Sequence, residues 1–193
     1  MNAFIDLGSF RGDTLRMFLG SEEYKKDRWT IFAFEPNPYV TPDCIEHTVF
    51  SRKAAWTEDG KIALFVSKRR KTRSGATVMK NKLEKDFCVP VKVKCFDFSK
   101  WILDNFNKKD YVVIKFNIEG AEYLILKKMI ADGSIHYVNR IYVQFHAHKM
   151  KMDKEEQRDL IRQLQTIDGL DLQPDYKGSE KHPERASIEW YLK

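Results

Sequence analysis

Short apolar runs alternate along the chain with segments in which apolar residues recur every three or four positions. The first pattern is typical of buried strands and the second of one face of a helix. Together they predict an α/β domain spanning residues 1–193, with a mostly parallel sheet and helices on both of its faces. A Glu-Asp-Gly turn at residues 58–60 predicts a hairpin between two of the strands. Strands are predicted over residues 3–7, 30–34, 48–50, 53–56, 62–66, 89–96, 111–116, 140–145, 170–173 and 186–192, and helices after Asp13, over 98–105, from Gly120 onward and after Asp153.

Composition and charge exclude several classes of protein. The chain has 193 residues, 42% of them hydrophobic, which is enough apolar surface for a buried core. Lys and Arg number 34 against 28 Asp and Glu, so the net charge of +6 favours anionic partners only mildly. The apolar runs are too short to cross a bilayer, and no secretory signal is visible. Three cysteines without C-x-x-C spacing disfavour a disulfide framework and a zinc knuckle, so we expect a cytoplasmic protein without a membrane partner.

The first predicted strand runs into a turn that contains Gly8 and Gly12. A strand that feeds a glycine-bearing turn and then a helix presents backbone N–H groups at the sheet edge where nucleotide-like cofactors bind. Two glycines alone are more often part of a plain strand–turn–helix. Glu35, which closes the next strand, strengthens the prediction because a carboxylate there can accept both hydroxyls of a ribose. Its alternative role is to cap a turn in a proline-rich corner.

The residues of this turn discriminate between cofactors. The dinucleotide pattern Gly-x-Gly-x-x-Gly and the triphosphate-binding pattern Gly-x-x-x-x-Gly-Lys-Ser/Thr are both absent. Phe10 and Arg11 occupy the stretch where a dinucleotide loop needs a glycine, and the turn begins with Asp6, whose charge suits a cationic amino group. S-adenosylmethionine carries an ammonium, a sulfonium and a ribose but no phosphate, so it fits best. The residues predicted to hold it are Asp6, Gly8, Ser9, Phe10, Arg11, Gly12, Asp13, Thr14, Glu35, Pro36, Asn37 and Asn117.

Four segments, taken in order and with their spacing, carry a family resemblance. They are residues 4–8 with Gly12, residues 34–38, residues 53–56 ahead of the turn at 59–60, and residues 115–122, which read Lys-Phe-Asn-Ile-Glu-Gly-Ala-Glu. The last segment is the most specific. The chain resembles, over nearly its whole length, the FkbM family of S-adenosylmethionine-dependent methyltransferases. Its small size, short N-terminus and lysine content are also similar to those of glycan-modifying methyltransferases of large algal viruses, which act in the host cytoplasm.

The resemblance implies a fold and an activity. The fold is the Rossmann-like class I methyltransferase, a seven-stranded sheet whose last hairpin is reversed. The activity is methylation of hydroxyl groups, in many members on sugars or natural products. Ala54 and Ala55 fall in one of the matching segments and are expected beside the cofactor. One departure is informative, because the family usually has Asp where this chain has Asn117, and an amide cannot ionise.

Candidate catalytic residues follow the fourth and fifth strands of the predicted parallel sheet. A carboxylate role that Asn117 cannot fill passes to Glu119. His146 and His148 follow the next strand, and His146 is the predicted general base because imidazole titrates near neutral pH. Two ordinary strand-end histidines are an equal alternative. A divalent metal held by Glu119 with His146 or His148 is a further option, since a metal can lower the pKa of an acceptor hydroxyl.

The remaining polar segments have predicted roles as well. Lys115 is predicted to form a structural ion pair, and Glu122 to cap a helix. Residues 68–77, a basic run followed by Ser-Gly-Ala-Thr, are predicted to contact the acceptor, although the run reads equally as a solvated loop. The predicted function is methylation of a carbohydrate hydroxyl, such as one on a rhamnose of a glycan. The alternatives are an RNA 2′-hydroxyl methyltransferase, disfavoured because no aromatic residues are interleaved with the charges, and a non-catalytic binding module.

Overall fold

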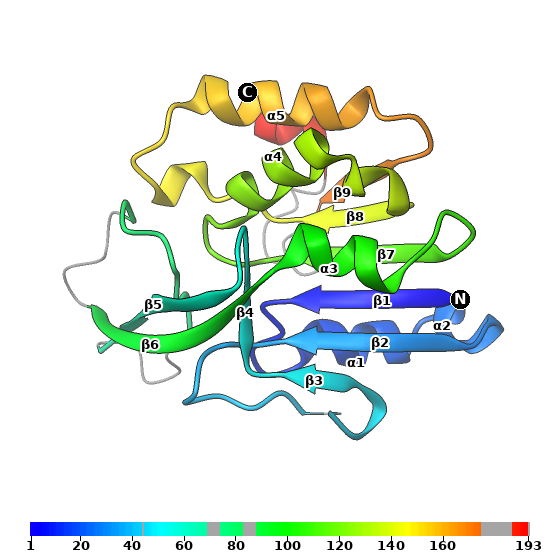
Figure 1. The fold of residues 1–193 in the computed structure, drawn as a ribbon, viewed down its shortest axis with the longest axis horizontal. Coiled ribbons are helices and arrows are strands. Elements are labelled where there is room, and N and C mark those ends of the chain that lie inside the picture. Colours follow the sequence, from blue (N-terminus) through cyan, green and yellow to red (C-terminus); the bar gives the residue numbers. More distant parts are fainter. Residues whose placement is uncertain (44, 69–73, 83–87, 175–186, 193) are drawn as a thin grey trace.

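The computed structural model describes the chain apart from residues 44, 69–73, 83–87, 175–186 and 193. Within the described part, six parallel strands form the main sheet in the order β3-β2-β1-β7-β8-β9 (Figure 1). The chain moves outward from β1 to β3 on one side and from β7 to β9 on the other, so the order reverses between β1 and β7. The bounds are β1 Asn2–Leu7, β2 Trp29–Phe34, β3 Val49–Ser51, β7 Tyr111–Phe116, β8 Arg140–Val143 and β9 Asp171–Pro174.

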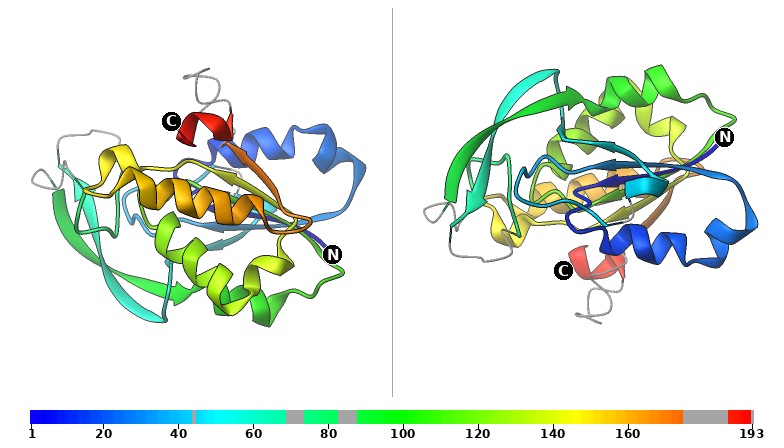
Figure 2. Two further views of the ribbon diagram at one scale, coloured as in Figure 1. Left: turned by 90° about the horizontal axis from the view of Figure 1, so that it is seen from above. Right: turned by 90° about the horizontal axis from the view of Figure 1, so that it is seen from below.

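Helices cover both faces of the main sheet (Figure 2). α3 and α4 lie on one face, and α1 and α2 lie on the other with the 3-10 helix η6. α5 runs beside α4 and β9 and starts directly after Asp153, as predicted. In the described part, no helix has the length and apolar character that a membrane span requires. The helix bounds are α1 Asp13–Leu19, α2 Glu22–Lys26, α3 Phe98–Asn105, α4 Glu122–Asp132, α5 Lys154–Gln165 and η6 Ile188–Leu192.

The hydrophobic core lies on both sides of the two central strands. β1 and β7 bury nearly every side chain, which accounts for the almost continuous apolar composition of both segments. On one side Phe4 of β1 stacks on Phe18 of α1, with ring centroids 4.0 Å apart. On the other side Phe98 of α3 packs edge-on against Phe116 of β7, with centroids 5.9 Å apart. Burial of such a side chain contributes about 1.5–3 kcal/mol, so the loops at the strand ends rest on a well-packed base.

A second sheet of three strands stands beside the carboxyl ends of the main sheet (Figure 1). It consists of β4 Lys53–Trp56, β6 Cys88–Asp97 and β5 Gly60–Ser67, in the order β4-β6-β5. The predicted hairpin between β4 and β5 is therefore wrong, because β6 lies between them, parallel to β4 and antiparallel to β5. In the central position β6 buries Val93 and Cys95 beside apolar residues of both neighbours and pairs along both of its edges.

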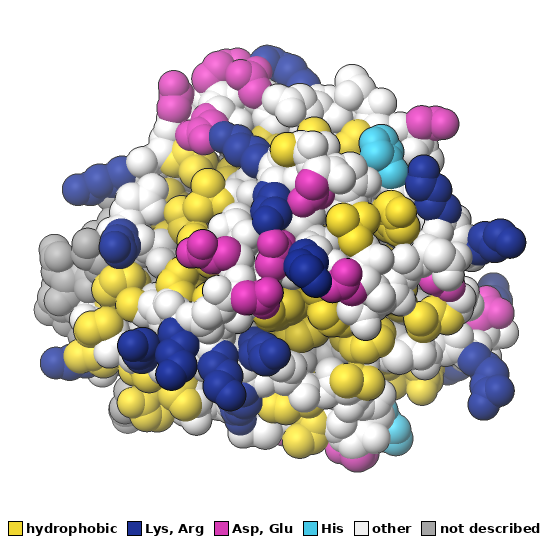
Figure 3. Space-filling view, viewed as in Figure 1, with side chains coloured by type: hydrophobic (Ala, Val, Ile, Leu, Met, Phe, Trp, Pro, Cys, Tyr) yellow, Lys and Arg dark blue, Asp and Glu magenta, His cyan; other side chains and the backbone are white. Residues whose placement is uncertain are grey.

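A row of lysines crosses the outer face of the second sheet. Lys94 of β6 pairs with Lys53 of β4 on one side and with Lys61 of β5 on the other. All three side chains are exposed, and none forms an ion pair with another described residue. Lys and Arg side chains gather over this part of the molecule (Figure 3, lower left). We call these three residues the lysine row; like charges directly opposite one another on a sheet are destabilising.

The C-terminal segment departs from prediction. Residues 188–192 of the strand predicted over 186–192 form the 3-10 helix η6, and residue 186 lies outside the described residues. Ile188 and Tyr191 are both buried, and their spacing of three fits one side of a 3-10 turn rather than one face of a strand. The Tyr191 ring packs against Phe145 with centroids 5.4 Å apart. In the described part the main sheet thus has six strands, all parallel, rather than seven with a reversed hairpin.

Candidate functional site

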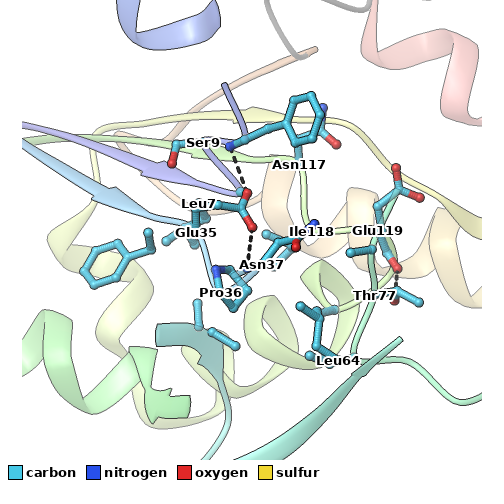
Figure 4. A pocket seen from close by; sticks show the side chains of 18 of the residues that line it. Leu7, Ser9, Glu35, Pro36, Asn37, Leu64, Thr77, Asn117, Ile118 and Glu119 are labelled. Carbon is cyan, nitrogen blue, oxygen red and sulfur yellow. Dashed lines mark hydrogen bonds between the residues drawn. The ribbon is translucent and has the colours of Figure 1, made fainter. Parts of the chain in front are cut away.

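A pocket opens at the carboxyl ends of β1, β2 and β7, beside the point where the strand order reverses (Figure 4). About 1000 Å³ of space lies inside it, counted out to its open mouth. Sheets of this kind bind their ligands at this position. The predicted site residues that line it are Gly8, Ser9, Phe10, Asp13, Thr14, Glu35, Pro36, Asn37, Ala54, Ala55, Ser74, Gly75, Ala76, Thr77, Asn117 and Glu119.

Gly8 allows the ends of β1 and β7 to pass each other closely. Its φ is +78°, which favours glycine, and a Cβ placed there would lie 2.2 Å from the carbonyl oxygen of Asn117. The Gly8 N–H donates to the carbonyl of Phe34 over 2.9 Å, so the turn is also tied to β2. Two residues later Phe10 takes a φ of +49° and donates its N–H to Glu35 Oε2 over 2.8 Å. The turn thus aligns three strand ends around one pocket.

Glu35 closes the pocket from the end of β2. Its carboxylate is buried and accepts the N–H groups of Phe10 and Asn37, each over 2.8 Å, as the dashed lines in Figure 4 show. Burial raises the pKa of Glu35, while the two backbone hydrogen bonds act in the opposite direction. A carboxylate has about four acceptor positions, so two N–H donors leave it able to accept hydroxyls as well.

Ser9 carries a buried polar atom at the pocket. The residue is 4% exposed and lines the pocket, and its Oγ has no hydrogen-bond partner among the described residues. A buried hydroxyl without a partner costs free energy, and one that faces a pocket gains a partner when a polar ligand binds. Ser9 and Glu35 together therefore fit a ligand that bears hydroxyl groups.

Three residues predicted to touch the cofactor do not line the pocket. Asp6 is completely buried, and its Oδ1 lies 2.8 Å from Nζ of Lys115, which also donates to the Gly8 carbonyl over 3.0 Å. The structural ion pair predicted for Lys115 is confirmed, and this internal ammonium faces Asp6 where the ammonium of a ligand was expected. Arg11 is exposed, and Gly12 is packed so that a Cβ would lie 2.7 Å from the Asp43 carbonyl.

Asn117 meets the pocket from the end of β7. Its Nδ2 donates to Oε1 of Gln144 over 2.8 Å, a hydrogen bond that orients the amide. Gln144 follows β8, and nothing in its sequence context marked it as part of the site. Asn117, where the resemblance implied Asp, thus has an amide partner on the neighbouring strand end.

Glu119 lies at the far wall of the pocket with an unusual backbone. Its φ is +53°, and its carbonyl accepts the hydroxyl of Thr77 over 2.6 Å. Its carboxylate accepts Nζ of Lys82 at 2.8 Å and Nζ of Lys149 at 3.1 and 3.2 Å. Burial raises the pKa of Glu119, but the nearby charges of His146, Lys149 and Lys82 outweigh burial and lower this pKa to about 2. The carboxylate is therefore ionised at neutral pH.

His146 lies behind Glu119, not in the pocket. Its side chain is completely buried, and Nδ1 lies 2.9 Å from Oε1 of Glu122, which also accepts the His146 backbone N–H. Nε2 has no hydrogen-bond partner in the described part of the chain and lies 3.7 Å from Oε1 of Glu119. The structure therefore does not bring His146 to an acceptor directly, because the chain turns into the 3-10 helix η4 (Ala147–Lys149) after β8 ends at Val143.

The other predicted residues fall around this cluster. Glu122 also accepts the N–H of Gly120 over 2.9 Å, so it ties the loop before α4 to the loop after β8 and is structural, as predicted. His148 is exposed, with its ring centroid 6.2 Å from that of His146. The described residues contain no group of three or more His, Cys, Asp or Glu that could hold a metal ion. Of the predicted basic run, residues 69–73 lie outside the described residues.

Lys82 and Lys149 are site residues that sequence reasoning missed. Lys82 follows the pocket-lining segment, and Lys149 ends η4, so both reach Glu119 from segments far away in the chain. Each looks in the sequence like one more surface lysine of a basic protein. No local signal could have found them, since their role depends on a carboxylate placed by β7.

Comparison with known proteins decides the family. A family model described as the methyltransferase FkbM domain matches residues 6–169, from within β1 to the loop after α5. The chain belongs to the FkbM methyltransferase family. Searches among curated proteins and among solved structures found no match. Membership of the FkbM family supports S-adenosylmethionine-dependent methyl transfer, and the parallel sheet flanked by helices agrees with the Rossmann-like fold of such enzymes.

Proposed function

We propose that this FkbM-family protein is an O-methyltransferase that transfers the methyl group of S-adenosylmethionine to a hydroxyl of a carbohydrate. The observation that carries the proposal is the composition of the pocket. At the ends of β1 and β2, which we call the inner end of the pocket, Ser9 and Glu35 are available to a ligand with hydroxyls. At the opposite, outer end, Glu119 presents an ionised carboxylate. A methyl donor with a ribose needs acceptors for its hydroxyls, and an acceptor hydroxyl needs a hydrogen-bond acceptor that orients it.

The residues of the inner end fit the cofactor. Glu35 would accept the ribose hydroxyls, and the hydroxyl of Ser9 would gain the partner that it lacks. Ala54 and Ala55 provide a small apolar wall that suits an adenine ring. Gly8 keeps the turn free of a side chain beside Asn117. S-adenosylmethionine held there would supply a methyl carbon made electrophilic by its positively charged sulfur.

At the outer end the acceptor meets Glu119. A sugar hydroxyl can donate a hydrogen bond to this carboxylate, which orients the oxygen and stabilises the loss of its proton. Transfer would form the oxygen–methyl bond as the sulfur–methyl bond breaks, and the hydroxyl proton would pass along this hydrogen bond and on to water, because a carboxylate with a pKa of about 2 does not retain it. His146 lies behind this carboxylate, with Nδ1 2.9 Å from Oε1 of Glu122 and Nε2 3.7 Å from Oε1 of Glu119. The predicted base is thus one step removed from the acceptor.

A second candidate, methylation of a 2′-hydroxyl of RNA, is favoured by one observation. The lysine row presents three ammonium groups side by side, without ion-pair partners among the described residues, near the pocket-lining strands β4 and β5. Such a row suits a phosphate backbone. The described lining of the pocket itself carries no comparable cluster of arginines or lysines for phosphates, since its Lys115 is paired with Asp6.

Binding of the cofactor is the first test. Titration calorimetry with S-adenosylmethionine and with its demethylated product should show binding, and Glu35→Gln should weaken the affinity roughly tenfold, as expected for loss of charge-assisted hydrogen bonds. Glu46→Gln is the matched control, since Glu46 is exposed in the 3-10 helix η1 (Ile45–His47), outside the pocket. An affinity that is unmeasurable in the wild-type protein would favour a non-catalytic binding module.

The acceptor is the second test. The protein is incubated with methyl-labelled S-adenosylmethionine and two panels, rhamnose-type glycosides and short RNAs. Label in the glycosides that resists mild base supports the proposal, because methylation of a hydroxyl gives a base-stable ether. Label that mild base removes would be a methyl ester and would contradict methylation of a hydroxyl. Label in the RNA panel alone would replace the proposal by the second candidate.

A further inference from the structure

One wall of the pocket, which we call the wall segment, belongs to the insert between β5 and β6 and consists of residues 74–82. Residues 74–78 line the pocket, and the described part of this segment continues to Lys82. It is tied to β5 by two backbone hydrogen bonds between Thr77 and Phe65, at 2.7 and 3.1 Å. On its other side it is tied to Glu119, through the Thr77 hydroxyl and the Lys82 ammonium. The wall segment is therefore hydrogen-bonded to both the backbone carbonyl and the side-chain carboxylate of Glu119.

Lys82 is buried to an extent that is rare for lysine. Its side chain is 5% exposed, and its Nζ donates to Glu119 Oε2 over 2.8 Å and to the Gly75 carbonyl over 2.5 Å. Transfer of an ammonium group out of water is costly unless charge and hydrogen bonds replace the water. Lys82 is therefore stable in this position only while Glu119 and the wall segment are both in place.

Lys149 cannot replace it. The Lys149 ammonium lies 3.1 and 3.2 Å from the same carboxylate, and its side chain is 32% exposed. An ion pair that water reaches is weak and leaves its partners free to move. The shorter and more deeply buried contact, from Lys82, is the one that fixes the direction of the carboxylate.

The backbone of Glu119 cannot fix that direction by itself. A φ of +53° is unfavourable for a residue with a side chain by about 1–2 kcal/mol, so tertiary contacts must hold it. The next residue, Gly120, also has a positive φ, +105°, and packs against Met150. Two consecutive residues in this region leave the position of the carboxylate to the side chains that contact it, and Lys82 is the more buried of the two lysines that hydrogen-bond to it.

We propose that Lys82 is a positioning residue for methyl transfer: it holds the carboxylate of Glu119 at the pocket wall, and with it the acceptor hydroxyl. The proposal rests on the proposed function, because it takes Glu119 as the group that meets the acceptor. Lys82 touches neither acceptor nor cofactor and acts through Glu119. Its second contact, to the Gly75 carbonyl, makes the same ammonium a link between the acceptor-facing carboxylate and the pocket wall.

Kinetics separate positioning from a general loss of structure. Lys82→Met keeps the length of the side chain and removes the ammonium. We expect kcat to fall on the order of tenfold to a hundredfold, as misplacement of an aligning group does, while the affinity for S-adenosylmethionine stays unchanged. Lys82→Arg, which keeps the charge, should recover part of the rate. Lys92→Met is the matched control, because Lys92 is exposed on the outer face of β6. A fall in cofactor affinity that parallels kcat would overturn the proposal.

A double-mutant cycle tests whether Lys82 acts through Glu119. In the Glu119→Gln background, Lys82→Met should leave kcat within about twofold of the single variant, since the group that it positions has already been changed. Losses that multiply would show that Lys82 acts independently of Glu119 and would overturn the proposal.

Hydrogen exchange gives a readout that needs no turnover. The amide of Thr77 donates to Phe65, and that of Met79 donates to the Thr77 hydroxyl over 3.0 Å, so both report on the wall. Lys82→Met should speed exchange at these amides about tenfold, and Lys92→Met should not. Unchanged exchange would overturn the link between Lys82 and the wall even if no acceptor is ever found. Faster exchange together with an inactive wild-type protein would instead locate the failure in the proposed function.

Discussion

Gly8 is the position where the fold and the site depend on the absence of a single side chain. Its φ is +78°, and a Cβ added there would lie 2.2 Å from the Asn117 carbonyl oxygen, so both conformation and space act against substitution. Gly133 has nearly the same φ, +80°, yet a Cβ there would meet nothing within 4 Å. Substitution of each by alanine therefore imposes the same backbone penalty at both sites and a clash at only one of them.

The expected magnitudes follow from these two contributions. Alanine in the left-handed region costs about 1–2 kcal/mol, and this cost is shared by Gly8→Ala and Gly133→Ala. Relief of the clash at Gly8 requires the ends of β1 and β7 to move apart, where Asn117 donates its N–H to the Leu7 carbonyl over 3.2 Å. Overpacking of this kind costs about 1–3 kcal/mol more. We expect Gly8→Ala to be less stable than Gly133→Ala by that second amount.

Urea unfolding measures this difference directly. If the two variants have equal m values, the difference between their urea midpoints gives the contribution of the clash. Thermal unfolding gives a second measurement, in which 1 kcal/mol corresponds to a difference of about 2–4 °C in Tm for a chain of this size. Gly8→Ala should also lose affinity for S-adenosylmethionine, and Gly133→Ala should keep it. If the two variants unfold within about 0.5 kcal/mol of each other, the close approach of Gly8 and Asn117 does not govern this region.

Three further predictions concern charges. The folded-state pKa of Glu119, about 2, lies below its ordinary value of 4.5, so its stabilising contribution is complete above pH 4.5 and is lost as pH falls toward 2. Between pH 5 and pH 2 the wild-type protein should lose about 3 kcal/mol more stability than Glu119→Gln, measured by urea unfolding; parallel losses would contradict the pKa. Lys94→Thr, at the centre of the lysine row, removes the repulsion across the row and should stabilise the protein by about 0.5–1 kcal/mol at low salt, with a smaller gain in about 0.5 M NaCl; a gain that does not change with salt would contradict the repulsion. Lys115→Met should cost about 3–5 kcal/mol because it removes the ammonium from the buried Asp6 carboxylate. Adding Asp6→Asn should restore part of that stability, whereas a loss equal to the sum of the two single variants would show that the pair is not coupled.

The sheet and the end of the pocket beside β1 and β2 were predictable because their signals are local. Buried strands such as β7 bury both faces and read as continuous apolar runs, and the glycine turn after β1 carries its positive φ values in its own residues. Glu35 could be placed because it closes a strand that must lie next to β1 in a doubly wound sheet. Each of these inferences needed only a short stretch of chain and the order of strands.

The charged surroundings of Glu119 and the other buried ion pairs were harder to predict because contacts between distant segments set them. His146 was expected at the acceptor, but the strand ends at Val143 and the ring turns inward to Glu122. Asp6 was expected to bind a ligand, but Lys115, 109 residues away, pairs with it. The hairpin expected between β4 and β5 is opened by β6, which the turn residues could not reveal.

The amino-acid sequence by itself therefore determined the parallel sheet, the glycine turn and the position of Glu35, since burial and backbone conformation leave a periodic or local trace in the residues concerned. Tertiary structure alone decided which charges meet: Lys115 with Asp6, and Lys82 and Lys149 with Glu119. A lysine has the same appearance in a sequence whether it is solvated or buried. Its partner is chosen by the packing of segments that the chain brings together only when it folds.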